Sequence, residues 1–443
     1  MTAETSRIDL SGYIDLVEKF PAYAAEGAVT QIIGITAECR GLSITLGELC
    51  AIENQSGETI QAEAIGFKDG TTVLMPLSDL QGVGPGARVR ALSRRMSAPA
   101  GEALLGRVLD GIGRPQDGGP ALVDCRRVAV HRAAPPPAER MPIVDVCETG
   151  IRALDGLLTL GKGQRIGIFA GAGVGKSTIL GALASRSQAD VTVIGLIGER
   201  GREVYDFVRE SLGPDGLKRS VVVAAPSDAP PLQRLKAPFV ATSIAESFKD
   251  AGHDVLLVMD SLTRFGAAAR QVGLALGEPP TSKGYPPSLF SELPRLVERP
   301  GNYRDGSITG IYTVLVEGDD LNDPVADSIR SLLDGHIVLS RALAERGHFP
   351  SVDVLGSVSR LMPNLIGDAQ KSAAEKFRRL LAVHRDHKDL IDVGAYKEGA
   401  DPLVDESVRK IARLEQFLKQ DLSKPSSFKE TLSALERAVG DKS

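Results

Sequence analysis

A glycine-rich stretch in the middle of the chain ends in lysine, serine and threonine, and these residue types at this spacing can bind phosphate. The stretch is Gly171-Ala172-Gly173-Val174-Gly175-Lys176-Ser177-Thr178. Glycine lets backbone N–H groups wrap closely around an anion, in conformations that a side chain would obstruct. The lysine would reach the terminal phosphates of a nucleotide, and the serine hydroxyl would join the coordination of Mg²⁺. The stretch therefore predicts a phosphate-binding loop.

The segments on either side of this loop are those that the chemistry requires. An apolar run at 165–170 precedes the loop, and a helical pattern at 176–184 follows it. The free N–H groups and the dipole at the start of a helix favour a bound anion. The pattern departs at Ala170, where glycine is usual, but alanine is small. A chance glycine-rich turn is therefore the weaker interpretation.

Two further apolar runs end in carboxylates, Glu199 and Asp260. The carboxyl ends of parallel strands lie at one edge of a sheet, so both acids are expected beside the phosphate loop. Asp260 would hold Mg²⁺ directly or through water, and Glu199 would orient the water that attacks the γ-phosphate. Spacing alone leaves an alternative open, in which Glu199 only pairs with Arg200 or Arg202 at the surface.

The transition state of phosphoryl transfer spreads negative charge over the γ-phosphoryl oxygens, so a cation must lie nearby, often from a neighbouring subunit. Arg360 follows the last strand predicted from the sequence and is one candidate among several, because arginine is abundant in this chain. Phe349 lies in the same region. On physical grounds alone it is more typical of a core residue than of one that stacks on a base.

Three folded parts are expected around these residues. Short alternating runs, including 29–35, 42–46, 60–65 and 87–92, predict a small closed β domain over residues 26–94. A Pro-rich lead-in at 95–147 opens the central domain, 95–368, where apolar strand-length runs alternate with helices. Such alternation predicts a parallel sheet covered on both faces. Strand signals then stop, and residues 369–443 predict a helical domain.

A short amphipathic helix is expected ahead of the β domain, within residues 1–25. Apolar residues recur at helical spacing between Leu10 and Phe20, and Ser11 is a possible cap. The pattern leaves two interpretations open. The helix either packs on the first domain or docks a partner.

Composition narrows the class of protein. The chain has 443 residues, 42% hydrophobic and 25% charged, which is typical of a multidomain globular protein. Its net charge is −5 and its aromatic content is 4%, so nucleic acid is not expected as the main partner. No apolar run approaches membrane-spanning length, and the first residues lack a signal-peptide pattern. We expect a cytoplasmic protein unless a partner carries it to a membrane.

Four stretches in combination resemble a known family. They are the phosphate loop, Gly198-Glu199-Arg200-Gly201-Arg202-Glu203, Asp260-Ser261-Leu262-Thr263-Arg264 and Gly277-Glu278-Pro279-Pro280-Thr281-Ser282-Lys283-Gly284-Tyr285-Pro286-Pro287-Ser288. They resemble the catalytic subunit of rotary ATP synthases and, more closely, the ATPases of type III protein export. The resemblance runs from the β domain through the helical tail.

The resemblance implies an α/β fold, with a RecA-like P-loop core between an N-terminal six-stranded β-barrel and a C-terminal helical domain. It also implies a ring-shaped homohexamer that binds ATP between subunits. Within the site, the resemblance implies that Glu199 is the catalytic carboxylate and that Lys176 contacts the phosphates. Ser177 and Asp260 would hold the Mg²⁺ that accompanies ATP.

The same resemblance gives two more residues a role, and Arg200, directly after Glu199, is a further candidate catalytic residue. Arg360 would be the arginine finger presented to a neighbour's site. Phe349 falls where the family packs an aromatic ring against adenine.

Two dipeptides in the helical tail favour the flagellar branch of the family. Ala395-Tyr396 and Asp401-Pro402 are similar to the flagellar ATPase, whereas injection-system ATPases of virulence apparatus tend to differ there. The implied partners are a stator-like regulatory protein at the N-terminal helix and a central-stalk-like protein. The export gate, chaperones and secreted substrates would engage the C-terminal domain. The implied location is the cytoplasm, peripheral at the inner-membrane face of the export apparatus.

Three rival functions remain alongside this interpretation. A non-catalytic nucleotide-binding ring subunit would have no need for the carboxylate Glu199. A ring-shaped RNA translocase would be expected to carry a more basic, more aromatic first domain. Proton-driven ATP synthesis uses the same site as hydrolysis, so motifs at the nucleotide site do not separate the two.

Overall fold

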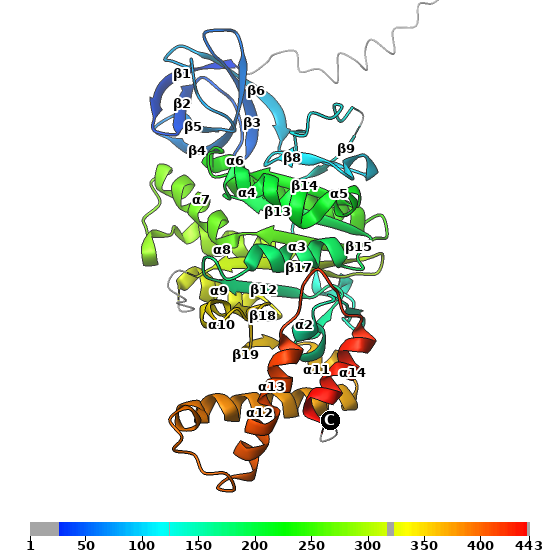
Figure 1. Cartoon of the computed structure of the whole chain (residues 1–443). Coiled ribbons are helices and arrows are strands. Elements are labelled where there is room, and N and C mark those ends of the chain that lie inside the picture. Colours follow the sequence, from blue (N-terminus) through cyan, green and yellow to red (C-terminus); the bar gives the residue numbers. More distant parts are fainter. Residues whose placement is uncertain (1–25, 124, 317–322, 441–443) are drawn as a thin grey trace, which may run out of the picture. The chain divides into compact units, whose positions relative to one another are not determined.

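The computed structural model describes residues 26–123, 125–316 and 323–440, which form two compact units divided between Met96 and Ser97 (Figure 1). The N-terminal helix predicted within residues 1–25 lies outside the described residues. Among the residues that are described, no helix is both long and apolar enough to cross a membrane.

The first unit is a closed barrel of antiparallel strands in the order β1-β2-β5-β4-β3-β6. The strands are β1 (Glu26–Ile33), β2 (Thr36–Arg40), β3 (Glu48–Glu53), β4 (Thr59–Lys68), β5 (Thr71–Pro76) and β6 (Arg88–Arg95). Its interior holds small or branched side chains such as Cys50, Ile52 and Ala62, which suit a narrow barrel. The predicted closed β domain is confirmed. The strand predicted at 42–46 is wrong, because this segment connects β2 to β3 and leaves Leu46 58% exposed.

The second unit is built on a nine-stranded sheet in the order β19-β18-β12-β17-β15-β13-β14-β8, with β16 beside β17. The strands are β8 (Val108–Asp110), β12 (Arg165–Ala170), β13 (Val191–Ile197), β14 (Ser220–Ala225), β15 (Asp254–Asp260), β16 (Gly301–Asn302), β17 (Ser307–Leu315), β18 (Gly335–Leu339) and β19 (Val352–Ser359). Neighbours are parallel except at β19 and β16. The predicted parallel core is confirmed.

Two edges of this sheet differ from the sequence prediction. β8 comes from the predicted lead-in and pairs with β14, and three residues are too few to show a strand pattern. β19 pairs antiparallel with β18, so β18 is not the last strand of the sheet. β19 alternates buried and exposed residues, as expected for an edge strand that is covered on one face.

Helices cover both faces of the sheet. α6 (Pro231–Lys249) packs on β13, β14 and β15, and α3 (Lys176–Arg186) covers the opposite face. Alternation along β13 separates the two faces: Ile194 shares a core with α3, whereas a side chain at Gly195 would meet Ala241 of α6. The glycine-rich segment 171–175 joins the sheet to the helical layer on the α3 face.

The remaining elements of the second unit are mostly short. The helices are η1 (Glu102–Leu104), η2 (Pro137–Glu139), α2 (Arg152–Leu157), α4 (Gly201–Asp206), η3 (Phe207–Leu212), α5 (Gly213–Lys218), α7 (Leu262–Ala275), η4 (Ser282–Gly284), α8 (Pro287–Val297), α9 (Pro324–Leu332), α10 (Arg341–Glu345) and α11 (Met362–Leu365). Two small antiparallel ladders join β7 (Ser97–Ala100) to β9 (Arg126–Ala129), and β10 (Val146–Cys147) to β11 (Leu160–Gly161).

Three helices form the C-terminal part: α12 (Asp368–Asp392), α13 (Pro402–Leu418) and α14 (Phe428–Val439). Apolar stripes on these helices meet one another and α2, and the rings of Phe377 and Phe417 lie 5.3 Å apart. The predicted helical C-terminal domain is confirmed. The residue Gln420, just after α13, donates a backbone hydrogen bond of 3.0 Å to the Phe349 carbonyl.

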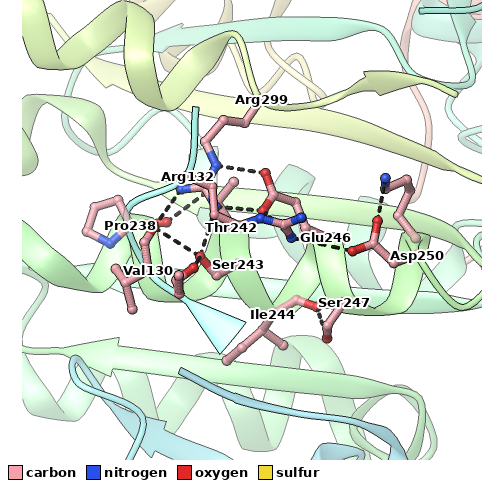
Figure 2. A network of polar contacts seen from close by, with 12 residues as sticks. Val130, Arg132, Pro238, Thr242, Ser243, Ile244, Glu246, Ser247, Asp250 and Arg299 are labelled. Carbon is pink, nitrogen blue, oxygen red and sulfur yellow. Dashed lines mark hydrogen bonds and ion pairs between the residues drawn. The ribbon is translucent and has the colours of Figure 1, made fainter. Parts of the chain in front are cut away.

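A buried ion pair joins Arg299, which follows α8, to Glu246 of α6, and the same arginine also contacts the residue after β9 (Figure 2). Arg299 is fully buried and donates two hydrogen bonds of 2.7 Å to the Glu246 carboxylate. Its guanidinium also donates to the Val130 carbonyl at 3.0 Å and to Ser243 Oγ at 2.8 Å. These groups are withdrawn from water, and without Arg299 the only charged partner left to Glu246 among the described ion pairs is the half-exposed Arg132, 3.4 Å away.

Replacing Arg299 by methionine is expected to lower the free energy of unfolding by about 3–5 kcal/mol, because Glu246 is left as a buried carboxylate. Urea denaturation followed by circular dichroism measures the change. The control is Lys218→Ala, which removes an ion pair whose side chains are 77% and 92% exposed, and should cost less than about 1 kcal/mol. Equal effects of the two substitutions would contradict the prediction.

Candidate active site

The glycine-rich loop lies between β12 and α3, at the carboxyl end of a central strand of the sheet. Gly173 and Gly175 have φ angles of 77° and 88°, which side-chain-bearing residues rarely adopt. α3 begins at Lys176, and both Ser177 and Thr178 are exposed at its first turn. The loop therefore offers free N–H groups, a lysine and two hydroxyls to one ligand.

Lys176 connects the loop to the two predicted acids. Its Nζ lies 2.5 Å from Asp260 Oδ1 and 3.4 Å from Glu199 Oε1. Asp260 ends β15, Glu199 follows β13, and these two strands are neighbours in the sheet. Thr313 of β17 donates a 2.6 Å hydrogen bond to the same oxygen, Asp260 Oδ1, and so helps to orient that carboxylate. The sheet order thus brings together residues that are far apart in the sequence.

The environment of Glu199 changes its acidity. Its side chain is 13% exposed, and this burial is the largest cause that raises the pKa above its ordinary value. The positive charge of Lys176 opposes the change, whereas the Asp260 carboxylate adds to it. A carboxylate with a raised pKa is a stronger proton acceptor than an ordinary glutamate.

These residues line a pocket of about 670 Å³, within the range of about 300–1,000 Å³ typical of small-ligand sites. Arg200 lies on its rim with an 83% exposed side chain and a 3.7 Å ion pair to Glu203.

Two residues near this pocket had no role predicted from the sequence: Thr313 and Arg264. Arg264 lines the pocket from the first turn of α7, and its position directly after Asp260-Ser261-Leu262-Thr263 was the available signal.

Phe349 lies beside the end of the phosphate loop. A Cβ atom placed at Gly175 would lie 3.6 Å from two ring carbons of Phe349, an ordinary van der Waals distance. The ring therefore lies directly beside this position of the loop. The ring is 47% exposed, so Phe349 is not the core residue that its type alone suggested. An exposed aromatic ring beside a phosphate loop is a ready surface for a base.

Arg360 lies elsewhere, immediately after the edge strand β19. Its side chain is exposed, and its backbone N–H donates to the Asp334 carbonyl at 3.0 Å. It is not among the residues that line the pocket of its own chain. The structure therefore brings Lys176, Ser177, Glu199 and Asp260 together and leaves Arg360 apart from them.

A parallel sheet with a glycine-rich loop after one strand, and acids after two others, defines the chain as a P-loop nucleotide hydrolase. The chain belongs to the ATP synthase alpha/beta family. Models of that family's nucleotide-binding and beta-barrel domains match residues 150–359 and 29–93. A model of the T3SS EscN ATPase C-terminal domain matches residues 366–437, which assigns the chain to the type III secretion branch.

Relatives of both export systems are similar over nearly the whole chain. "Flagellum-specific ATP synthase" of Bacillus subtilis is 47% identical over 97% of this chain and 98% of its own length. The protein of the same name in Salmonella typhimurium is 49% identical over 94% of each chain. "Type 3 secretion system ATPase" of Xanthomonas euvesicatoria is 47% identical, again over 94% of each.

Two solved structures share the fold. The assembled ATPase EscN of the enteropathogenic E. coli type III secretion system is 42% identical with a TM-score of 0.89. EscN in complex with its central stalk EscO is 41% identical with a TM-score of 0.87. In both comparisons 94% of this chain and 100% of the other chain are covered.

Proposed function

We propose that this chain is a Mg²⁺-dependent ATPase that hydrolyses ATP as a homohexameric ring and energises export of flagellar proteins through the type III secretion apparatus. The observation that carries the proposal is the placement of Lys176 between Asp260 and Glu199, at the mouth of the phosphate loop. A ring subunit without catalysis has no need for a carboxylate with a raised pKa at this point. Hydrolysis, as opposed to synthesis, is supported by the relatives that are named as ATPases of type III secretion.

ATP binds with its phosphates in the loop from Gly171 to Thr178, where Lys176 exchanges its contacts with the two acids for contacts with phosphate oxygens. Ser177 and Asp260 would hold Mg²⁺, because their hydroxyl and carboxylate oxygens are the hard ligands that this ion prefers. When bound there, the ion would supply positive charge against the phosphates. Phe349 packs against the adenine ring, for which its exposed face is available.

Glu199 accepts the proton of the attacking water and orients that water in line with the γ-phosphate. Its low exposure and raised pKa support this role over the surface pairing that the sequence left open. Arg200 completes the rim of the site. Arg360, exposed and apart from its own pocket, reaches the site of a neighbouring subunit, where its charge stabilises the transition state.

The raised pKa of Glu199 predicts an acid limb in the pH profile. As pH falls, Glu199 becomes protonated and can no longer accept a proton. Because its pKa is raised, this loss of activity occurs at a higher pH than for an ordinary glutamate, whose pKa is about 4.3. The dependence of kcat/KM on pH in the free enzyme measures it. The residual activity of Glu199→Gln should lack this limb, and a limb shared by both proteins would contradict the assignment.

The proposed assembly follows the relatives. EscN is solved as an assembled ATPase and in complex with a central stalk, and we extend an assembly and a stalk partner to this chain. A ring of six copies is the arrangement that the family resemblance implies. A stator-like protein at residues 1–25, and the export gate, chaperones and secreted substrates at the C-terminal domain, complete the proposal. The working boundaries are 26–94 for the barrel, 95–368 for the ATPase domain and 369–443 for the helical domain. The protein acts in the cytoplasm at the inner-membrane face of the export apparatus.

The proposal is tested by the release of phosphate from ATP at increasing protein concentration, with and without a chelator of Mg²⁺. Activity that requires Mg²⁺ and rises cooperatively with concentration supports shared sites in a ring. The flagellar assignment is tested by restoring motility to a bacterium that lacks its flagellar ATPase. Restored secretion by an injection system, without motility, would replace flagellar export by the virulence type.

A further inference from the structure

The loop that carries Phe349 is held from two sides. Ser351 Oγ donates a 2.6 Å hydrogen bond to the carbonyl of Val174 in the phosphate loop. On the other side, the backbone N–H of Gln420 donates a 3.0 Å hydrogen bond to the carbonyl of Phe349 itself. His348 and Ser351 are buried, whereas Phe349 is 47% exposed. The backbone of this loop is therefore clamped while the ring stays available.

Gln420 lies two residues after the end of α13, and its side-chain amide is fully engaged. Its Oε1 accepts a 2.8 Å hydrogen bond from the Arg152 N–H. Its Nε2 donates to the carbonyl of Gly150 at 2.8 Å and to that of Lys424 at 3.1 Å. An amide that is bound at both ends has one orientation, so the backbone N–H of the same residue is fixed in place.

We propose that Gln420 is a positioning residue of the base-binding site. Its side chain anchors the N–H that holds the Phe349 carbonyl, and this contact sets the ring against Gly175. The inference rests on the proposed function, in which Phe349 packs against adenine. Gln420 is absent from the residues that line the phosphate pocket, so its effect falls on the base of the nucleotide and leaves the phosphates untouched.

The test compares ligands with and without a base. Gln420→Met keeps the length of the side chain and removes its three hydrogen bonds. Titration calorimetry of the full chain with Mg²⁺ measures the Kd for ATP and the Kd for inorganic tripolyphosphate. We expect the Kd for ATP to rise about tenfold, as for the loss of one or two hydrogen bonds, and the Kd for tripolyphosphate to stay unchanged.

Two comparisons separate positioning from a general loss of structure. Gln416→Ala is the matched control, since this glutamine is exposed on α13, close to Gln420 in the sequence, and both Kd values should match the wild type. Phe349→Ala should weaken ATP binding as Gln420→Met does. The double variant should be no weaker than Phe349→Ala alone, because the two residues act through one contact.

Three results would overturn the proposal: an unchanged Kd for ATP, equal weakening of ATP and tripolyphosphate, or additive effects in the double variant. If Gln420→Met does not fold by circular dichroism, Gln420→Glu takes its place. That variant keeps the acceptor for Arg152 N–H, loses both donors, and should also weaken ATP alone. A wild type that binds neither ligand would instead refute the proposed function, and this inference with it.

Discussion

Replacing Glu199 with glutamine is expected to lower the rate of ATP hydrolysis by about 10²–10⁴-fold while ATP binding persists. The amide keeps the size of the side chain but accepts no proton from the attacking water. Lys176 lies 2.5 Å from Asp260 and 3.4 Å from Glu199, so Asp260 is its tighter partner and the phosphate site should survive the change. The loss should therefore appear in kcat.

Phosphate release at saturating Mg²⁺ and ATP measures the rate, and calorimetry measures binding. Glu292→Gln is the control, because it removes a carboxylate that pairs with Arg295 on the surface of α8, away from the pocket. It should leave both quantities unchanged. Near-normal hydrolysis by Glu199→Gln would show that Glu199 serves only as an ion-pair partner of Lys176 and takes no part in catalysis.

The parts of this site that the sequence predicts best are those encoded locally. A strand, a glycine turn and a helix start within fourteen consecutive residues, from Arg165 to Thr178, specify the phosphate loop without reference to the rest of the chain. The contact of Lys176 with Glu199 and Asp260 is different. It depends on β15 lying between β13 and β17, and sheet order is a property of the whole fold.

Thr313 shows the same limit more clearly. It is a single residue within β17, a buried strand whose sequence indicates no functional position. Its hydroxyl nevertheless donates a 2.6 Å hydrogen bond to the Asp260 carboxylate. The edge strands β8 and β19 were missed for a related reason. Three residues, or a strand with one covered face, carry little hydrophobic signal of their own, and pairing with a formed sheet decides their conformation.

The two dipeptides that favour the flagellar branch turn out to be one structural motif. The Tyr396 hydroxyl donates to the Asp405 carboxylate at 2.8 Å and lies 3.0 Å from the Asp401 carbonyl. Asp401 in turn caps α13, whose first residue is Pro402. In the sequence, the two dipeptides stand as separate markers of the flagellar branch. Because these residues are in contact, a substitution of Tyr396 would remove a hydrogen bond from the start of α13.

Arg360→Ala is expected to lower ATP hydrolysis by about 10³–10⁵-fold, the effect typical of an arginine finger, with ATP binding retained. The substitution should not disturb its own subunit, because the side chain is exposed and its backbone contact with Asp334 does not involve the guanidinium. Arg385→Ala is the control, since this arginine is 59% exposed on α12 and should leave activity unchanged. Normal activity of Arg360→Ala would refute its role.

Loss of activity alone does not show that Arg360 acts in a neighbouring subunit, but mixing two inactive variants does. In a ring, each site takes Glu199 from one subunit and Arg360 from the next, so a Glu199→Gln subunit can supply the arginine that an Arg360→Ala subunit lacks. Random mixing at equal amounts makes about a quarter of the sites complete, half of one kind times half of the other. Activity should therefore return on mixing. If the mixture stays as inactive as its components while the ring still assembles, Arg360 acts within its own chain.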